Sequence, residues 1–398
     1  MNTKINRLIM LNQMAGPLFR ELAEDLAPLY ESGCVLVTGH PDTLALKVGK
    51  GCKLVIKPAP IHNRSSRFQR VLSWFKYVLF ISRSVLFARN GDGILLVSNP
   101  PILGGWVWLL TRLNKVPYSV LVLDIHPEVF VRLGALKENS LVVKFWYSMN
   151  RLVYSNARAV VTIGERMAEL VNAQCHEDAP DVAVVPLWVD VNTIKPMPRN
   201  DNPYALDFIK ESDEFIVLYS GNMGSSHDID SMLMAALALR DITKIKFLFI
   251  GEGDKYKDVE EFIQKHRLTN VALFPFQPEP MIKYTLPLAD VSLVSLDQGM
   301  EDLMIPSKSF YYLAAGSAVV AIANEKSELS DLLRQRACGV LVPPGDPNTL
   351  AETLKSLESN PDKLASMKNN ARQLAEEKFS RHACTADFAD FLKQSDLL

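Results

Sequence analysis

The sequence predicts an α/β protein built from two parallel, doubly wound sheets. Short apolar runs alternate with helical segments through nearly the whole chain, the pattern of a parallel sheet whose helices cross between strands. The alternation restarts after a proline-rich stretch from Pro186 to Pro203, which is typical of a linker. A chain of 398 residues is also too long for one ordinary core. We therefore expect domains at 1–190 and 191–380, and a closing helix at 381–398 that returns to the first domain.

In the first half, polar residues follow the predicted strands. The pattern predicts strands over 7–12, 34–38, 94–97, 118–123 and 159–163, and helices over 18–30 and 141–156. Parallel sheets hold their ligands beyond the carboxyl ends of the strands. The side chains that we expect at such ends are Ser98, Asn99, Asp124, His126, Glu128 and Glu165.

In the second half, glycines occupy the corresponding places. We expect strands over 215–219, 246–250, 271–274, 291–295 and 318–323, and helices over 230–240 and 361–392. Gly221, Gly251 and Gly253 each lie within three residues of the end of a predicted strand, where a glycine lets backbone approach a ligand closely.

The stretch between the strands at 291–295 and 318–323 predicts a phosphate site. Pro306 and Ser307 open a short helix that Gly316 closes. Lys308 falls in its first turn, where the helix dipole makes a cation unfavourable by about 0.3–1 kcal/mol unless an anion is bound. A loop that joins a strand to a helix is also a common phosphate seat. The alternative is a solvated lysine that the helix tolerates.

Composition excludes several classes of protein. Hydrophobic residues make up 48% and charged residues 22%, the proportions of an ordinary globular chain. The longest uncharged stretch, Gly93 to Thr111, is broken by Ser98-Asn99-Pro100-Pro101 and so predicts no membrane span. The five cysteines are scattered without a C-x-x-C pair, which favours reduced thiols and argues against a structural zinc site. The apolar run at 8–11 is too short for the core of a signal peptide, so we expect a cytoplasmic protein.

Positive charge is concentrated in the first half. Residues 1–195 hold 22 Lys and Arg against 15 Asp and Glu, and residues 43–91 hold ten basic residues and no acidic one, interleaved with aromatic side chains. Such a segment could bind an anionic membrane surface. Nucleic acid would attract the same charges, and a pair of amphipathic helices with a solvated basic face is the structural alternative. Of these we favour the membrane and expect no nucleic-acid partner.

A series of short motifs resembles glycosyltransferase family 4. In order along nearly the whole chain they are SNPPILGG (98–105), VLDIHPE (122–128), VVTIGERM (160–167), VVPLWVD (184–190), YSGNMGSSHDID (219–230), FIGEG (249–253) and MIPSKSFYYLAAGSAVVAIA (304–323). The chain is most similar to the branch that builds bacterial surface polysaccharides. The resemblance implies a GT-B fold, in which two Rossmann-like domains face each other across a cleft.

The resemblance also implies roles for individual residues. His126 matches the histidine near the donor sugar, Lys308 a basic residue facing the diphosphate, and Glu301 the first glutamate of a Glu-x7-Glu pattern; these three are the catalytic candidates. The donor-binding candidates are Gly16, Gly221, Asn222, Gly251, Gly253, Ser307, Ser309 and Tyr311. The sequence departs from the family where its usual Arg and Lys in the Gly221 loop are absent, and where Tyr311 replaces the second glutamate, which holds the ribose.

The resemblance implies a retaining transferase that moves a sugar from a UDP- or GDP-sugar to a glycan acceptor. We expect that acceptor to be lipid-linked and the reaction to take place at the inner face of the plasma membrane. The leaving phosphate would accept the acceptor's proton, so we expect no metal and no other cofactor. Two other hypotheses stay open at this point: a nucleotide-sugar epimerase or hydrolase of the same fold, and a catalytically weakened scaffold in a polysaccharide-assembly complex. From the residues alone, the favoured interpretation of His126 is a core histidine bonded to a backbone carbonyl.

Overall fold

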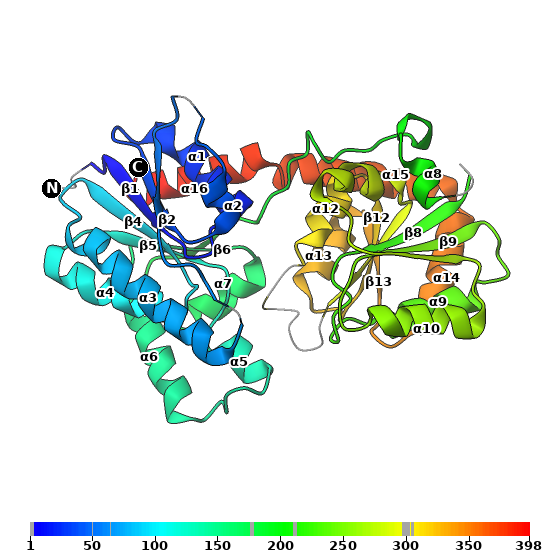
Figure 1. Ribbon diagram of the computed structural model, residues 1–398, viewed down its shortest axis with the longest axis horizontal. Coiled ribbons are helices and arrows are strands. Elements are labelled where there is room, and N and C mark those ends of the chain that lie inside the picture. Colours follow the sequence, from blue (N-terminus) through cyan, green and yellow to red (C-terminus); the bar gives the residue numbers. More distant parts are fainter. Residues whose placement is uncertain are drawn as a thin grey trace. The chain divides into compact units, whose positions relative to one another are not determined.

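The structure is a computed structural model that describes residues 4–49, 51–63, 65–175, 179–209, 213–296, 303 and 306–398. It divides into two compact units. Unit 1 consists of Met1–Pro186 together with Cys384–Leu398, and unit 2 of Leu187–Ala383. Each unit contains one parallel sheet (Figure 1).

The sheet of unit 1 has seven parallel strands in the order β3-β2-β1-β4-β5-β6-β7. Its central strands are fully buried runs of Leu, Ile and Val, as expected for a sheet covered on both faces. The strands are β1 (Arg7–Leu11), β2 (Cys34–Thr38), β3 (Leu54–Pro58), β4 (Asp92–Val97), β5 (Tyr118–Val122), β6 (Ala159–Thr162) and β7 (Val182–Val184).

Two groups of helices cover this sheet. In Figure 1, α3, α4 and α6 lie on one face, and α1 and α16 on the other. The buried hydroxyl of Tyr30 donates to the carbonyl of Leu397 at 2.8 Å, which attaches the end of the chain to unit 1. The helices are α1 (Pro17–Leu26), α2 (Pro41–Ala45), α3 (Arg67–Leu86), α4 (Leu103–Asn114), α5 (Glu128–Arg132), α6 (Leu141–Ser155), α7 (Glu165–Asn172) and α16 (Arg381–Gln394).

The sheet of unit 2 has six parallel strands in the order β10-β9-β8-β11-β12-β13, with an apolar core on each face. The strands are β8 (Phe215–Ser220), β9 (Ile245–Ile250), β10 (Val271–Phe274), β11 (Val291–Ser295), β12 (Ala318–Ile322) and β13 (Gly339–Val342). The helices are α8 (Ala205–Phe208), α9 (Ile229–Ala238), α10 (Tyr256–His266), α11 (Ile282–Thr285), α12 (Lys308–Ala314), α13 (Glu328–Arg336), α14 (Pro347–Glu358) and α15 (Pro361–Lys378).

The predicted α/β class with two Rossmann-like parallel sheets is confirmed, and the cleft between the domains stays a prediction. Several elements differ from the sequence-based expectation, among them the edge strands β3, β7 and β13, where no strand was expected. The basic segment 43–91 contains an edge strand, β3, which was missed because its residues are mostly exposed and form no continuous apolar run. The single helix expected over 361–392 is two helices, because the backbone at Phe379 and Ser380 pairs with Val189 and leaves the helical path. None of the described helices is both long and apolar enough to cross a membrane.

Candidate functional site

The carboxyl end of β8 meets the start of α12 in unit 2. Gly221, directly after β8, has φ +136°, a backbone conformation that favours glycine. A Cβ atom at this position would lie 3.5 Å from Nζ of Lys308, so the lysine ammonium lies against the Gly221 backbone. The expected helix start is also present, since α12 begins at Lys308 and Gly316, with φ +71°, follows its end.

Tyr219 holds the ammonium of Lys308. Nζ of Lys308 donates to the phenolic oxygen of Tyr219 at 3.1 Å and lies 4.3 Å from the centroid of its ring. The ring itself is buried. Its hydroxyl donates to the carbonyl of Asn222 at 2.6 Å and lies 2.7 Å from Nδ1 of His227. One phenol therefore fixes both the lysine and the loop that follows β8.

A second tyrosine fixes α12 to the same strand. The hydroxyl of Tyr312 donates to the carbonyl of Ser220 at 2.8 Å and accepts from the Ser220 amide at 2.9 Å. Burial raises the pKa of Tyr312 well above its ordinary value, so the phenol stays protonated and can make both bonds. The orientation of the first turn of α12 is thus set by the end of β8.

The loop after β9 packs against the loop after β8 at two glycines. Gly251 has φ +153°, and a Cβ on it would collide with the carbonyl oxygen of Gly221. Gly253 has φ +140°, and its Cβ would lie 2.7 Å from Oδ1 of Asn222. Only glycine permits this contact between the two loops. The sequence led us to expect a close approach of backbone at these glycines, and here the backbone of one loop lies directly against the other loop.

The end of β8, the loop after β10, α11 and α12 line a cavity of about 220 Å³ beside these two loops. Its lining includes Ser220, Gly221, Gln277, Ser307, Lys308 and Tyr311. Of the donor-binding candidates, Gly221, Ser307 and Tyr311 line this cavity, and Asn222, Gly251 and Gly253 form the adjoining loops. Ser309 differs, because one position further along α12 its side chain is fully buried, with Oγ facing the core instead of the cavity. Glu301 lies outside the described residues.

The other candidates belong to unit 1. Gly16 precedes α1 near the ring of His40, since a Cβ on it would lie 3.8 Å from Nε2 of that histidine. His126 follows β5, and its ring stacks on Phe130 at a centroid distance of 5.0 Å and lies 5.8 Å from that of Trp146. Among the described residues, Nδ1 of His126 has no hydrogen-bond partner although it is buried.

A hydrogen-bonded chain supports the backbone at His126. The amide of Asn150 donates to the His126 carbonyl at 2.6 Å and to Oε1 of Gln174 at 2.8 Å, and Gln174 in turn donates to Oε1 of Glu128 at 2.7 Å. Burial lowers the pKa of His126, although Asp124 acts in the opposite direction. Burial also raises the pKa of Glu128. The imidazole is therefore neutral near pH 7, and Nδ1 is able to bind a further polar group.

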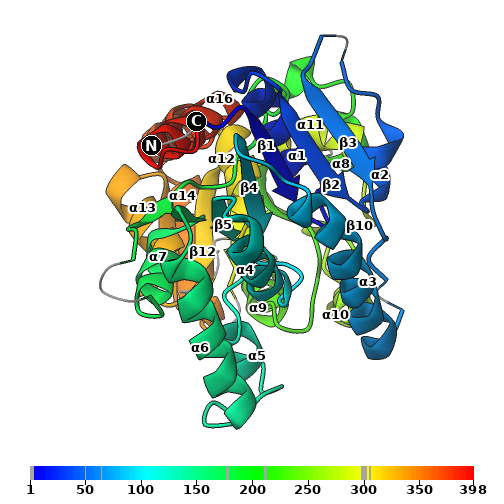
Figure 2. The ribbon, with the colours of Figure 1, turned by 90° about the vertical axis from the view of Figure 1, so that its left-hand side faces the viewer.

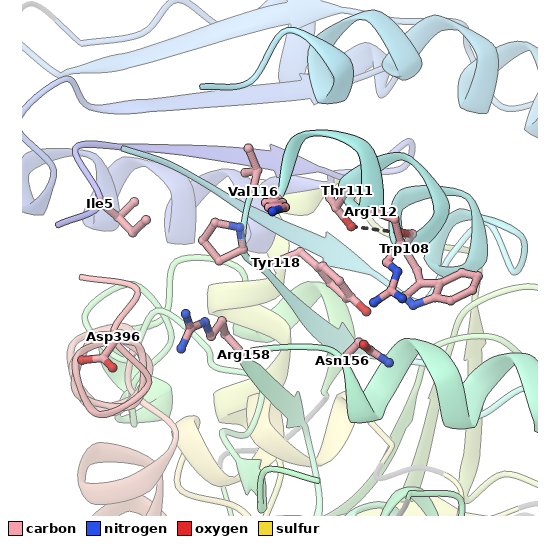
Figure 3. A pocket seen from close by; sticks show the side chains of 11 residues that line it. Ile5, Trp108, Thr111, Arg112, Val116, Tyr118, Asn156, Arg158 and Asp396 are labelled. Carbon is pink, nitrogen blue, oxygen red and sulfur yellow. Dashed lines mark hydrogen bonds between the residues drawn. The ribbon is translucent and has the colours of Figure 1, made fainter. Parts of the chain in front are cut away.

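Unit 1 contains at least three further hollows, of which two are lined in part by α4. One, of about 630 Å³, contains the cations Arg112, Lys115 and Arg158 but lies at the amino ends of the strands, opposite the edge where parallel sheets hold ligands (Figure 3). The other, of about 850 Å³, is apolar and extends from His126 between α3, α4 and α6. Within the described ranges, no three His, Cys, Asp or Glu side chains gather as a metal ion would require.

Sequence reasoning missed Tyr219, Tyr312 and Gln277. The residue types do not indicate a binding role. A tyrosine at a strand end or in a helix is as often a core residue as a ligand-binding one, and a single glutamine in a loop is equally uninformative. The only indication was position: Tyr219 closes a strand, and Gln277 follows β10 in the same sheet.

Comparison with known families shows two matches that together cover most of the chain. Residues 15–188 match the glycosyl transferase 4-like domain, and residues 207–374 match the glycosyl transferases group 1. The probable glycosyltransferase WbjE of Pseudomonas aeruginosa is 26% identical over 83% of this chain and 82% of its own. The putative colanic acid biosynthesis glycosyl transferase WcaI of Escherichia coli is 34% identical over 29% of this chain and 28% of its own.

Solved structures share the fold over the full length. Sucrose-phosphate synthase of Thermosynechococcus elongatus superposes with a TM-score of 0.74, 17% identity and 98% coverage of both chains. HepE of Anabaena, solved in complex with UDP, has a TM-score of 0.71, 14% identity, and coverage of 98% of this chain and 100% of its own.

The two sheets and the two matches define a glycosyltransferase of GT-B fold. The chain belongs to the family 4-like glycosyltransferases, as the sequence resemblance predicted. Of the three hypotheses drawn from the sequence, the transferase is the one that this assignment supports.

Proposed function

We propose that the protein transfers a sugar, with retention of anomeric configuration, from a nucleoside-diphosphate sugar to a lipid-linked glycan acceptor in surface-polysaccharide synthesis. Structures of HepE with UDP and with UDP-glucose make UDP the first candidate nucleotide, ahead of GDP. The similarity to WcaI, a putative enzyme of colanic acid biosynthesis, supports the polysaccharide role.

The observation that carries the donor assignment is the position of Lys308. Its ammonium lies against Gly221 at a cavity lined by the end of β8, the loop after β10, α11 and α12. Breaking the bond between sugar and diphosphate develops negative charge on the leaving phosphate. A cation that Tyr219 already holds in place stabilises this charge without reorganisation.

The leaving phosphate also serves as the base in this proposal. The acceptor hydroxyl forms the new bond to the anomeric carbon, and its proton passes to the departing phosphate oxygen. The cation that this scheme needs is Lys308, so we propose a reaction without a metal. His126, neutral and with Nδ1 unbonded within the described part of unit 1, would bind a hydroxyl of the sugar.

We also propose that the enzyme works at the inner face of the plasma membrane. The acid-free segment 43–91 contains β3 and α3, and the described basic side chains of α3 at Arg70, Lys76 and Arg83 are exposed. Exposed cations near an anionic surface contribute about 1 kcal/mol each to binding.

Calorimetry with UDP, GDP, ADP and CMP tests the donor site, because UDP should bind and Lys308→Ala should weaken its binding at least tenfold. Lys265→Ala, an exposed lysine near the end of α10, is the matched control and should bind UDP normally. Absence of nucleotide binding by the wild-type protein would refute the proposed donor site. The stereochemistry follows from the anomeric configuration of the product, measured by NMR.

A further inference from the structure

A large apolar hollow of unit 1 lies between the three helices α3, α4 and α6. Figure 2 shows α4 between α3 and α6, and the groove of about 850 Å³ runs along these three helices. Its walls are formed by side chains such as Phe75, Leu79, Trp106, Leu109, Phe145 and Met149. Gly104 and Gly105 let α4 pack closely on α6, because a Cβ atom on Gly104 would press on Val153 and one on Gly105 would press on Met149. We call this hollow the α3–α4–α6 groove.

The groove opens onto exposed apolar side chains. Phe75, Leu79 and Phe145 are 54%, 65% and 68% exposed, and further apolar residues on the same helices, including Phe68 and Leu113, are exposed outside it. Contiguous apolar surface of this kind marks a binding surface for an apolar partner. Single exposed residues would need no explanation, but here they surround a cavity.

Charge indicates what kind of apolar partner fits. The sequences of α3, α4 and α6 contain seven Lys and Arg and no Asp or Glu. Lys76, Arg83, Arg112, Lys144 and Arg151 are exposed. An apolar groove formed by helices that carry cations and no acidic residue is complementary to an amphiphile with an anionic head.

The inner end of the groove is polar and includes the candidate residue His126. Ser98, Asp124, His126 and Asn150 line that end, at the carboxyl edge of β4 and β5. A chain lying in the groove would therefore place its polar end beside His126.

We propose that the α3–α4–α6 groove binds the hydrocarbon chain of the acceptor lipid and so sets the position of the acceptor's reacting end. The inference rests on the proposed function, since it assigns a binding site to the lipid part of that acceptor. The chemical class is a long hydrocarbon chain attached to a phosphate. The groove holds the chain through apolar contact, and the net positive charge of the three helices favours a phosphate over a cationic head.

Tryptophan fluorescence measures this directly, because three of the five tryptophans, Trp106, Trp108 and Trp146, line the groove. The probes are n-alkyl phosphates of four to twelve carbons, kept below their micelle concentrations. We expect saturable binding whose affinity rises about twofold to fourfold per methylene, as burial of each CH₂ predicts. An alkyl trimethylammonium of equal length should bind at least tenfold more weakly than the phosphate.

Two substitutions on α6 separate the groove from the rest of the surface. Phe145→Glu places a charge in the groove and should reduce dodecyl phosphate affinity at least tenfold. Leu141→Glu is the matched control, since Leu141 is 84% exposed on the same helix, lies outside the groove, and brings the same change of charge. It should stay within about twofold of wild type, because its effect is only long-range charge.

Affinity independent of chain length, or equal losses in Phe145→Glu and Leu141→Glu, would overturn the proposal. So would sedimentation showing a dimer that Phe145→Glu dissociates, because a second copy would then be the occupant of the groove. UDP calorimetry keeps the two hypotheses apart. If UDP binds and alkyl phosphates do not, only the groove assignment falls; if no nucleotide binds, the proposed donor site falls, whatever the groove binds.

Discussion

The ammonium of Lys308 and the phenol of Tyr219 are joined both by a hydrogen bond of 3.1 Å and by contact with the ring face, although 89 positions separate them in the chain. An ammonium at the first turn of a helix is otherwise unfavourable. Tyr219 offsets part of this cost by its hydroxyl and ring, so the cation is held in place before any anion binds.

Replacing Lys308 by Ala should reduce the rate of sugar transfer by about 10²–10³, the usual cost of removing one preorganised stabiliser of developing charge. The fold should remain, since Lys308 is at the surface of a cavity and not in the core. Transfer assays and circular dichroism check the two expectations. Unchanged transfer in a folded Lys308→Ala protein would mean that the diphosphate binds elsewhere.

Replacing Tyr219 by Phe keeps the ring under Lys308 and removes the hydroxyl that binds Lys308 and the Asn222 carbonyl. We expect a loss of about 1 kcal/mol in the free energy of unfolding, typical of a buried hydrogen bond, and a smaller loss of transfer than in Lys308→Ala. Denaturant unfolding beside transfer assays gives the comparison. A loss of transfer as large as that of Lys308→Ala would show that the hydroxyl, and not the ammonium alone, is essential.

Gly251→Ala should destabilise unit 2 more than Gly345→Ala does. Both glycines have positive φ, which alone costs an alanine about 1–2 kcal/mol. At Gly345 a Cβ meets no atom within 4 Å, whereas at Gly251 it collides with the Gly221 carbonyl and forces the two loops apart. Thermal unfolding should rank the variants in this order, and UDP affinity should fall only in Gly251→Ala. Equal effects would argue that the loops separate without cost.

His126 should make stability depend on pH. Its pKa in the folded protein lies below the unfolded value of about 6.5, so the unfolded state takes up the proton first as pH falls. The free energy of unfolding should therefore decrease from about pH 7 down through the folded pKa, by at most about 1.4 kcal/mol per pH unit.

The comparison variant is His126→Phe, which keeps an aromatic ring against Phe130 and Trp146. Glu128 has a raised pKa and contributes the opposite slope, but it is present in both proteins and cancels in the difference. Denaturant unfolding between pH 5 and 8 gives that difference. A difference that does not change with pH would contradict a lowered His126 pKa.

Binding to vesicles should depend on the cations of α3 and α6. The triple change of Lys76, Arg83 and Lys144 to Gln should weaken co-sedimentation with anionic vesicles on the order of 100-fold, at about 1 kcal/mol per charge. Added salt should weaken the binding of the wild-type protein, because exposed charges are screened within about 8 Å at physiological ionic strength.

Substituting Lys257, Lys265 and Arg267 of unit 2, also exposed, removes the same charge at or just beyond α10 and should leave vesicle binding unchanged. Equal binding of the wild type to neutral vesicles would refute the electrostatic attraction.

The sequence by itself determined the elements of the fold and the places where loops leave the sheets. Apolar runs such as 215–219 and 291–295 are strands because side-chain periodicity is a local property, and the glycines after them mark loops for the same reason. The helix that begins at Lys308 was predicted from Pro306, Ser307 and Gly316 alone. The strand β3 was not, because an exposed edge strand carries little apolar pattern.

Only the tertiary structure decided which of these residues meet. Lys308 and Ser309 are adjacent in sequence, yet one helical step of rotation sends the first to the cavity and the second into the core. The contact of Lys308 with Tyr219 depends on how α12 packs across β8, and the α3–α4–α6 groove exists because three separate helices pack on one face of a sheet. Contacts between distant residues follow from strand order and helix rotation, which no local pattern specifies.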